Sequence, residues 1–162
     1  MKKIFIILIV FILVMLAAVS FGREREYDSV RIYFVDAQIM KLIGIDTQVK
    51  KGDAESVANE VVDAIIEGHD DNKKIRRVLP KIKNGMEVKV NDGVAYVDIK
   101  DEMAQQQEKS REIEGLAIYS VVNSLTSIDG MEAVSFSVNG IPQKDYAGFF
   151  DMRCTFTYSN IY

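Results

Sequence analysis

A hairpin signal in the middle of the chain constrains the fold more than any other feature of the sequence. In MEVKVNDGVAYVDIK, residues 86–100, two alternating runs flank Asp92 and Gly93, a dipeptide that favours a two-residue turn between antiparallel strands. Pairing the runs across this turn gathers these apolar side chains on one face: Met86, Val88, Val90, Ala95, Val97 and Ile99. A shift of one residue would mix the two faces, so we expect this register and an apolar sheet face that other elements must cover.

Two segments with helical periodicity can provide that cover. Apolar residues recur at helical spacing over residues 54–67, with Asp53 placed as an N-cap. A second helix is predicted to start after Ser110 and to end at the Asp129-Gly130 dipeptide. Its apolar stripe contains two serines, and we expect their hydroxyls to bond to carbonyls one turn earlier or to allow close approach of the sheet. These serines are Ser120 and Ser124.

Further strands are predicted from β-branched and alternating runs. Residues 30–35 predict a strand covered on both faces, and residues 40–49 predict its neighbour. EAVSFSVN at 132–139 alternates with its serines facing away from the core, while 149–158 predicts an edge strand or a loosely held tail. The order strand, strand, helix, hairpin, helix, strand indicates an α+β fold with a single mostly antiparallel sheet and two helices packed on one face.

An uncharged apolar run near the N-terminus predicts an association with the membrane. Residues 4–21 contain no charged side chain and follow Lys2 and Lys3. Their length suits a helix that crosses the hydrocarbon core, which favours an uncleaved anchor with the domain on the extracytoplasmic side. The alternative is a signal peptide cleaved after Ser20, which would release a secreted domain.

These features divide the chain into four parts. Residues 1–22 are the membrane anchor or signal peptide, 23–29 a charged spacer, 30–140 the α+β domain and 141–162 a C-terminal extension. A single domain of this size can bury enough apolar surface to fold without metals or disulfides.

No group of residues in the sequence indicates catalysis or cofactor binding. The only histidine, His69, lies in a polar loop, and the only cysteine, Cys154, has no histidine or basic cluster beside it. An esterase-like serine site or a zinc site needs more such groups than the chain contains. Phosphate-binding glycine motifs are absent, and a formal net charge of −4 gives no reason to expect nucleic acid as a partner. We therefore expect no catalytic residues, no metal site and no cofactor.

Several apolar side chains remain after the predicted core is assigned. On the second helix they are Ile118, Tyr119 and Val122, and on the hairpin Val94 and Tyr96 share the polar face. A helix that is apolar nearly all round is usually covered on two sides. Two explanations are open: the first helix or the C-terminal residues cover these side chains, or they form a docking surface for another copy or another protein.

Three stretches carry a resemblance to a known family: VVDAIIEG, LPKIKNGMEVKVNDGVAYVDIKDEM and LAIYSVVNSLTSIDGMEAVSFSVNG. They resemble the GerM (GerMN) domain of sporulation and spore germination proteins, from about residue 30 to residue 140. The resemblance implies an extracytoplasmic domain related to ring-building modules, which associate side by side in envelope and sporulation assemblies. It brings no catalytic residues with it. Relatives are often lipoproteins with a lipobox cysteine, and some have two domain copies, features that this sequence does not show.

The expected function is that of a non-enzymatic interaction module of the bacterial envelope, tethered to the cytoplasmic membrane through residues 4–21. It would assemble with itself or with other envelope proteins during spore formation or germination. The alternative is a small-ligand or cell-wall binding domain, which would require a concave pocket with converging polar groups.

Overall fold

The computed structural model describes residues 27–68, 73–142 and 146–162. Its first sheet is antiparallel, with the strand order β2-β1-β3. The strands β1 (Tyr27–Asp36) and β2 (Lys41–Lys50) pair along their whole length, whereas the short β3 (Ile75–Arg76) pairs only with the end of β1. Most of one β1 edge therefore has no neighbouring strand.

The second sheet contains the predicted hairpin. It consists of β4 (Met86–Asn91), β5 (Val94–Ile99) and β6 (Ala133–Val138), in the order β4-β5-β6. β4 and β5 are antiparallel, but β6 lies parallel to β5. A parallel neighbour needs a long crossover connection, and the second helix lies within it.

The predicted hairpin register is confirmed. Val88 lies opposite Val97, and Met86 lies opposite Ile99. Positive φ angles of 48° at Asp92 and 75° at Gly93 form the turn, as expected for a two-residue connection that follows the twist of the strands.

The two predicted long helices are also present. α2 (Ala54–Glu67) begins at its predicted N-cap, where Asp53 accepts a hydrogen bond from the Ser56 N–H at 2.8 Å. α4 (Arg111–Leu125) begins after Ser110 but ends before the Asp129-Gly130 dipeptide. The helix is followed by a non-helical turn, in which the Ile128 N–H donates to the Leu125 carbonyl.

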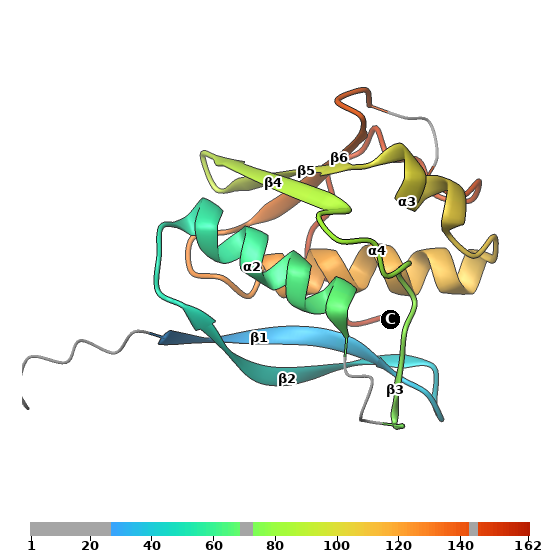
Figure 1. The fold of residues 1–162 in the computed structure, drawn as a ribbon, viewed down its shortest axis with the longest axis horizontal. Coiled ribbons are helices and arrows are strands. Elements are labelled where there is room, and N and C mark those ends of the chain that lie inside the picture. The colour runs from blue at the N-terminus through green and yellow to red at the C-terminus, as the bar shows by residue number, and fades with distance from the viewer. Residues whose placement is uncertain (1–26, 69–72, 143–145) are drawn as a thin grey trace, which may run out of the picture.

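The helices lie between the two sheets, which corrects the expectation of a single sheet with helices on one face. Figure 1 shows β1 and β2 below, α2 and α4 in the middle, and β4 to β6 above. The physical reason is visible in α4, where twelve of the fifteen residues are buried. A helix with so little exposed surface needs a cover on more than one side.

The strand β1 differs from its prediction because only one of its faces is fully covered. Val30, Ile32 and Phe34 are buried toward the helices, whereas Arg31 is exposed and Tyr33 is half-buried. Val35, on the same face as Arg31 and Tyr33, is buried again at the end of β1 that pairs with β3, so this second face is covered in part.

Two short elements were not predicted, and some predictions cannot be compared with the structure. The unpredicted elements are β3 and the one-turn-and-a-half helix α3 (Asp101–Gln106). Among the described residues, no helix is long and apolar enough to cross a membrane. The expected anchor at residues 4–21 and the loop histidine His69 lie outside the described residues.

Candidate interaction surfaces

Three serines from α4 and the turn after it complete the open edge of β1. Ser120 Oγ donates to the Tyr33 carbonyl at 2.6 Å, and Ser124 Oγ accepts from the Tyr33 N–H at 2.8 Å. Ser127 Oγ donates to the Arg31 carbonyl at 2.6 Å. Ser124 Oγ also donates to the Ser120 carbonyl, one turn earlier, so both predicted roles of the buried serines are confirmed. These hydroxyls replace a strand that β3 is too short to provide.

Side chains of α2 satisfy the edge of β4 in the same way. The Asn59 amide donates to the Val88 carbonyl at 2.7 Å and accepts from the Val88 N–H at 2.9 Å. The Glu55 carboxylate accepts from the Val90 N–H at 3.1 Å. The serine, asparagine and glutamate side chains of these helices thus hydrogen-bond to the edges of strands. These bonds hold each helix against a sheet.

Residues 146–162, here called the C-terminal strap, pack over α4. Tyr146, Met152 and Phe156 of the strap are buried. Phe156 exchanges two backbone hydrogen bonds with Val134 of β6, both at 2.8 Å. The predicted edge strand is therefore reduced to a single bridge, and the rest of the strap follows an irregular path along the helix.

A buried carboxyl group anchors the strap to α4. Glu114 has 0% of its surface exposed. Its oxygens accept the N–H groups of Ala147 at 3.1 Å, Phe149 at 3.0 Å and Phe150 at 3.2 Å. Burial of such a group is unfavourable unless it is hydrogen-bonded, so the three amides and the carboxyl group depend on one another.

Aromatic rings complete the contact between strap and helix. The Tyr162 ring stacks on Tyr119 with centroids 4.4 Å apart, and Phe156 meets Tyr119 edge-on at 6.1 Å. Gly115 allows this close approach, because a Cβ at that position would lie 2.7 Å from Tyr162 Cε1 and 3.0 Å from Phe150 Cζ. The strap therefore packs directly onto the backbone of α4.

A second buried polar contact lies at the start of the strap. The Tyr146 hydroxyl donates to Gln107 Oε1 at 3.2 Å, and Gln107 Nε2 donates to the Val78 carbonyl at 3.0 Å. Burial raises the pKa of Tyr146 above its usual value of 10.0, and the neighbouring Glu114 raises it further. The folded protein thus favours the neutral phenol.

This raised pKa predicts an alkaline weakening of the fold. Because the folded pKa of Tyr146 exceeds the unfolded value, its contribution to stability is complete below about pH 10 and is lost as the pH rises further. We expect wild type to lose about 1 kcal/mol more unfolding free energy than Tyr146→Phe between pH 9 and pH 11. Urea unfolding at both pH values measures the difference. Tyr27→Phe, at an exposed tyrosine, should match wild type, and equal losses in all three proteins would contradict the prediction.

The structure divides the five residues of the predicted docking surface between two environments. Ile118 and Val122 are 2% and 0% exposed, and Tyr119 is half-buried under the strap. The α4 part of this surface is therefore not exposed, because α2, β1 and the strap surround the helix. Val94 is half-buried and Tyr96 is 47% exposed, both on β5.

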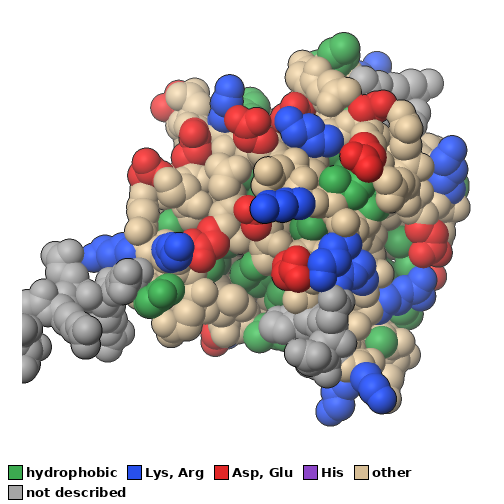
Figure 2. Space-filling model, in the orientation of Figure 1, with side chains coloured by type: hydrophobic (Ala, Val, Ile, Leu, Met, Phe, Trp, Pro, Cys, Tyr) green, Lys and Arg blue, Asp and Glu red, His purple; other side chains and the backbone are tan. Residues whose placement is uncertain are grey.

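Tyr96 occupies the middle of the outer face of the second sheet. Its strand neighbours are Lys89 of β4 and Ser135 of β6, and Ser135 Oγ lies 3.2 Å from Thr155 Oγ1 of the strap. We call this surface the Tyr96 face. On the side of the molecule drawn in Figure 2, positive and negative side chains are interspersed and no field of one sign dominates.

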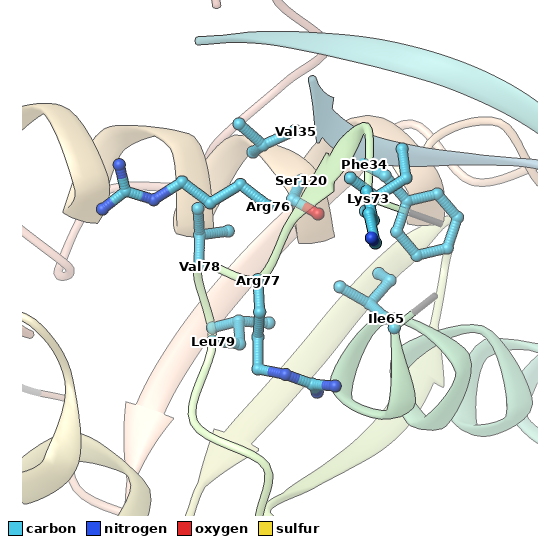
Figure 3. A pocket seen from close by; sticks show the side chains of 11 residues that line it. Phe34, Val35, Ile65, Lys73, Arg76, Arg77, Val78, Leu79 and Ser120 are labelled. Carbon is cyan, nitrogen blue, oxygen red and sulfur yellow. The ribbon is translucent and has the colours of Figure 1, made fainter. Parts of the chain in front are cut away.

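A small cavity between β1, α2 and the segment around β3 has the character of a packing gap. Its volume is about 140 Å³, below the range typical of ligand pockets. Figure 3 shows apolar side chains such as Phe34 and Leu79 in its wall. The Ser120 hydroxyl reaches this wall but is bonded to a backbone carbonyl, and Arg77 donates to carbonyls at the end of α2.

A wider surface groove of about 690 Å³ runs along the outer side of α2. Its walls carry charges of both signs, including Glu60, Asp63, Lys81 and Lys83. Burial and the nearby Glu60 raise the pKa of Asp63. Within residues 27–68, 73–142 and 146–162, no three metal-binding side chains are close enough to hold an ion. In the groove, Lys81 Nζ forms an ion pair with Glu67 Oε1 at 2.7 Å.

The fold and its edge contacts define an α+β domain in which two helices lie between two small sheets. The chain belongs to the Germane family, described as sporulation and spore germination, whose model matches residues 31–144. This confirms the family expected from the sequence. No curated protein matches the chain.

Two solved structures share the fold. The first GerMN domain of the sporulation protein GerM from Bacillus subtilis has a TM-score of 0.62 and 20% identity, covering 82% of this chain and 98% of that one. The tandem GerMN domains of the same protein give a TM-score of 0.61 and 19% identity, covering 80% of this chain and 46% of that one. At these identities the likeness extends to the fold alone.

Proposed function

We propose that this protein is a non-enzymatic interaction module of sporulation or germination, tethered to the membrane by residues 4–21 with its domain on the extracytoplasmic side. The observation that carries the proposal is the use of its polar side chains. Ser120, Ser124, Asn59 and Glu114 all bond to backbone groups of the scaffold. Family membership supports the biological setting.

The Tyr96 face is the surface that we propose for contact with another envelope protein. An exposed aromatic ring on a sheet face offers a large contact area at low entropic cost, which is why tyrosine is enriched in interfaces. The alternative of a small-ligand site has less support, because the cavity beside β1 measures only about 140 Å³ and the larger groove along α2 is a more open hollow with charges of both signs in its walls.

A photo-crosslinking experiment tests this proposal. A photoreactive phenylalanine analogue replaces Tyr96 in the full chain, and crosslinks are compared between growing and sporulating cells. We expect a discrete crosslinked product at Tyr96 in sporulating cells and none at Tyr158, a matched tyrosine that is 54% exposed on the strap. Only monomer at both positions under both conditions would contradict the proposed surface.

A further inference from the structure

The outer edge of β2 is an unpaired strand edge. β2 is the outermost strand of the first sheet, and within the part of the chain that the structure describes its ten residues pair with β1 alone. Figure 1 shows it along the lower border of the fold. Strand edges of this length are usually protected, because they offer a row of free N–H and C=O groups to any other strand.

The hydrogen bonds of β1 identify which residues of β2 face this edge. The Ala37 N–H donates to the Lys74 carbonyl and the Tyr33 N–H donates to Ser124 Oγ, both on the β3 side of β1. Residues of the same parity in β1 share that side, so its even-numbered residues bond to β2. Their partners are odd-numbered, which leaves the even-numbered residues of β2 pointing outward. Lys50 agrees, since its N–H bonds to Glu60 of α2 and not to β1.

The open part of the edge comprises Leu42, Gly44, Asp46 and Gln48. Among the described residues, none of these four has a backbone partner on the outer side. On the inner face, Ile43 and Ile45 are only half-buried at the border of the helices. The edge thus combines free backbone groups with apolar side chains that a further strand would cover.

We propose that the β2 edge binds the β2 edge of a second copy of this chain, antiparallel and centred on Ile45. In this arrangement Leu42 pairs with Gln48 of the second copy and Gly44 pairs with Asp46. Each hydrogen-bonded pair exchanges two backbone bonds. The two sheets would join into one continuous sheet across a two-fold axis.

This register follows from the open groups and the charges. It uses all four outward-facing residues, and it ends next to Lys50, whose N–H is already bonded. A shift by one hydrogen-bonded pair toward the C-terminal end of β2 would place Asp46 opposite its own copy, where like charges repel. A shift in the other direction would leave Gln48 beyond the end of the partner strand, whose first residue is Lys41.

Charge complementarity supports a second copy as the occupant. The Arg31 side chain crosses Gly44, where a Cβ would lie 2.7 Å from its Cδ, and binds Asp46 through Nε at 2.9 Å and Nη2 at 3.1 Å. In the proposed pair, Asp46 of the second copy lies beside that Gly44. Each guanidinium has five donors, so it can bridge both carboxylates.

A cysteine crosslink at the two-fold axis tests the proposal. Directly opposed residues that are not hydrogen-bonded have Cα atoms about 4.5 Å apart, within the range of a disulfide. In full-length protein carrying Cys154→Ser, we expect Ile45→Cys to form a disulfide-linked dimer in membranes treated with copper phenanthroline. Ile39→Cys, in the exposed turn before β2, should remain monomeric on non-reducing gels.

The register is checked by a mixed pair. Ile43→Cys and Thr47→Cys should each stay monomeric alone, because each lies far from its own copy across the axis. Co-production of the two variants should give a disulfide dimer, because Ile43 lies opposite Thr47 of the second copy. A dimer from Ile43→Cys alone would overturn this register.

A backbone substitution provides an independent measurement. Gln48→Pro removes an outward N–H but no bond to β1, so we expect loss of the dimer with the fold retained. Gln48→Ala keeps that N–H and should dimerise like wild type, as measured by light scattering of the full chain in detergent. If Gln48→Pro fails to fold, the cysteine experiment still decides.

This inference rests on the proposed function, since it names one partner of the same module, but the two can fail separately. A crosslink to another protein at Tyr96 together with monomeric Ile45→Cys would leave the interaction role standing and overturn the β2 dimer. An Ile45→Cys dimer without any Tyr96 product would support the β2 dimer and overturn the Tyr96 face as the surface for another envelope protein.

Discussion

Glu114→Ala should lower the free energy of unfolding by about 3 kcal/mol, the largest effect that we expect from a single polar substitution in this chain. The substitution leaves the N–H groups of Ala147, Phe149 and Phe150 without their acceptor and opens a void beneath the strap. Strap and helix should separate before the rest of the fold unfolds. Urea denaturation measures the loss, and limited proteolysis should show earlier cleavage within residues 146–162.

Two companion variants separate this effect from a change in helix charge. Glu112 is an exposed acid in the same first turn of α4, so Glu112→Ala should change stability by less than about 0.5 kcal/mol. Glu114→Gln keeps one acceptor oxygen but places an NH2 group against a backbone donor, and it should fall between wild type and Glu114→Ala. Equal stability of Glu112→Ala and Glu114→Ala would show that the carboxyl group does not anchor the strap.

Ser124→Ala should cost about 2 kcal/mol of unfolding free energy, because the Tyr33 N–H loses its acceptor on the edge of β1. Hydrogen exchange offers the more specific readout, since the Tyr33 amide proton should lose protection while the β4–β5 hairpin keeps its own. Ser135→Ala is the control, as that hydroxyl lies on the outer face of β6 and its hydrogen bond goes to Thr155 Oγ1 of the strap, not to β1. If Ser124 does not support the β1 edge, both variants will have the stability and the amide protection of wild type.

The parts of the fold that sequence predicted depend on residues close together in the chain. Asp92 and Gly93 specify the hairpin turn, and the alternation on either side specifies its register. Asp53 marks the start of α2 in the same local way. Such signals need no knowledge of what the element later packs against.

The number of sheets could not be predicted because it depends on edge contacts between distant residues. Ser120 and Ser124 bond to Tyr33, which lies far earlier in the chain, so a helix and not a strand completes the β1 edge. Periodicity places these serines on a buried face but does not say which backbone they reach.

Cover of α4 by the C-terminal residues was one of two explanations that the sequence left open, but the Glu114 anchor of the strap was not predicted, although the sequence held a clue. Glu114 resembles an ordinary first-turn acid, which is favourable at a helix N-terminus. It lies one turn before Ile118, however, on the same side of α4 as residues that the structure buries. A charged residue on an apolar side of a helix indicates a buried polar contact, and Gly115 next to it indicates a close neighbour.

The position of the strap after α4 in the chain affects the protein during its synthesis. Residues 146–162 are synthesised after α4 and β6, so the strap contacts of Tyr119 and Gly115 cannot form until the strap itself has been made. Until then, this side of α4 is exposed to chaperones and to aggregation. Folding that begins before residues 146–162 have been made therefore lacks the aromatic contacts between strap and helix.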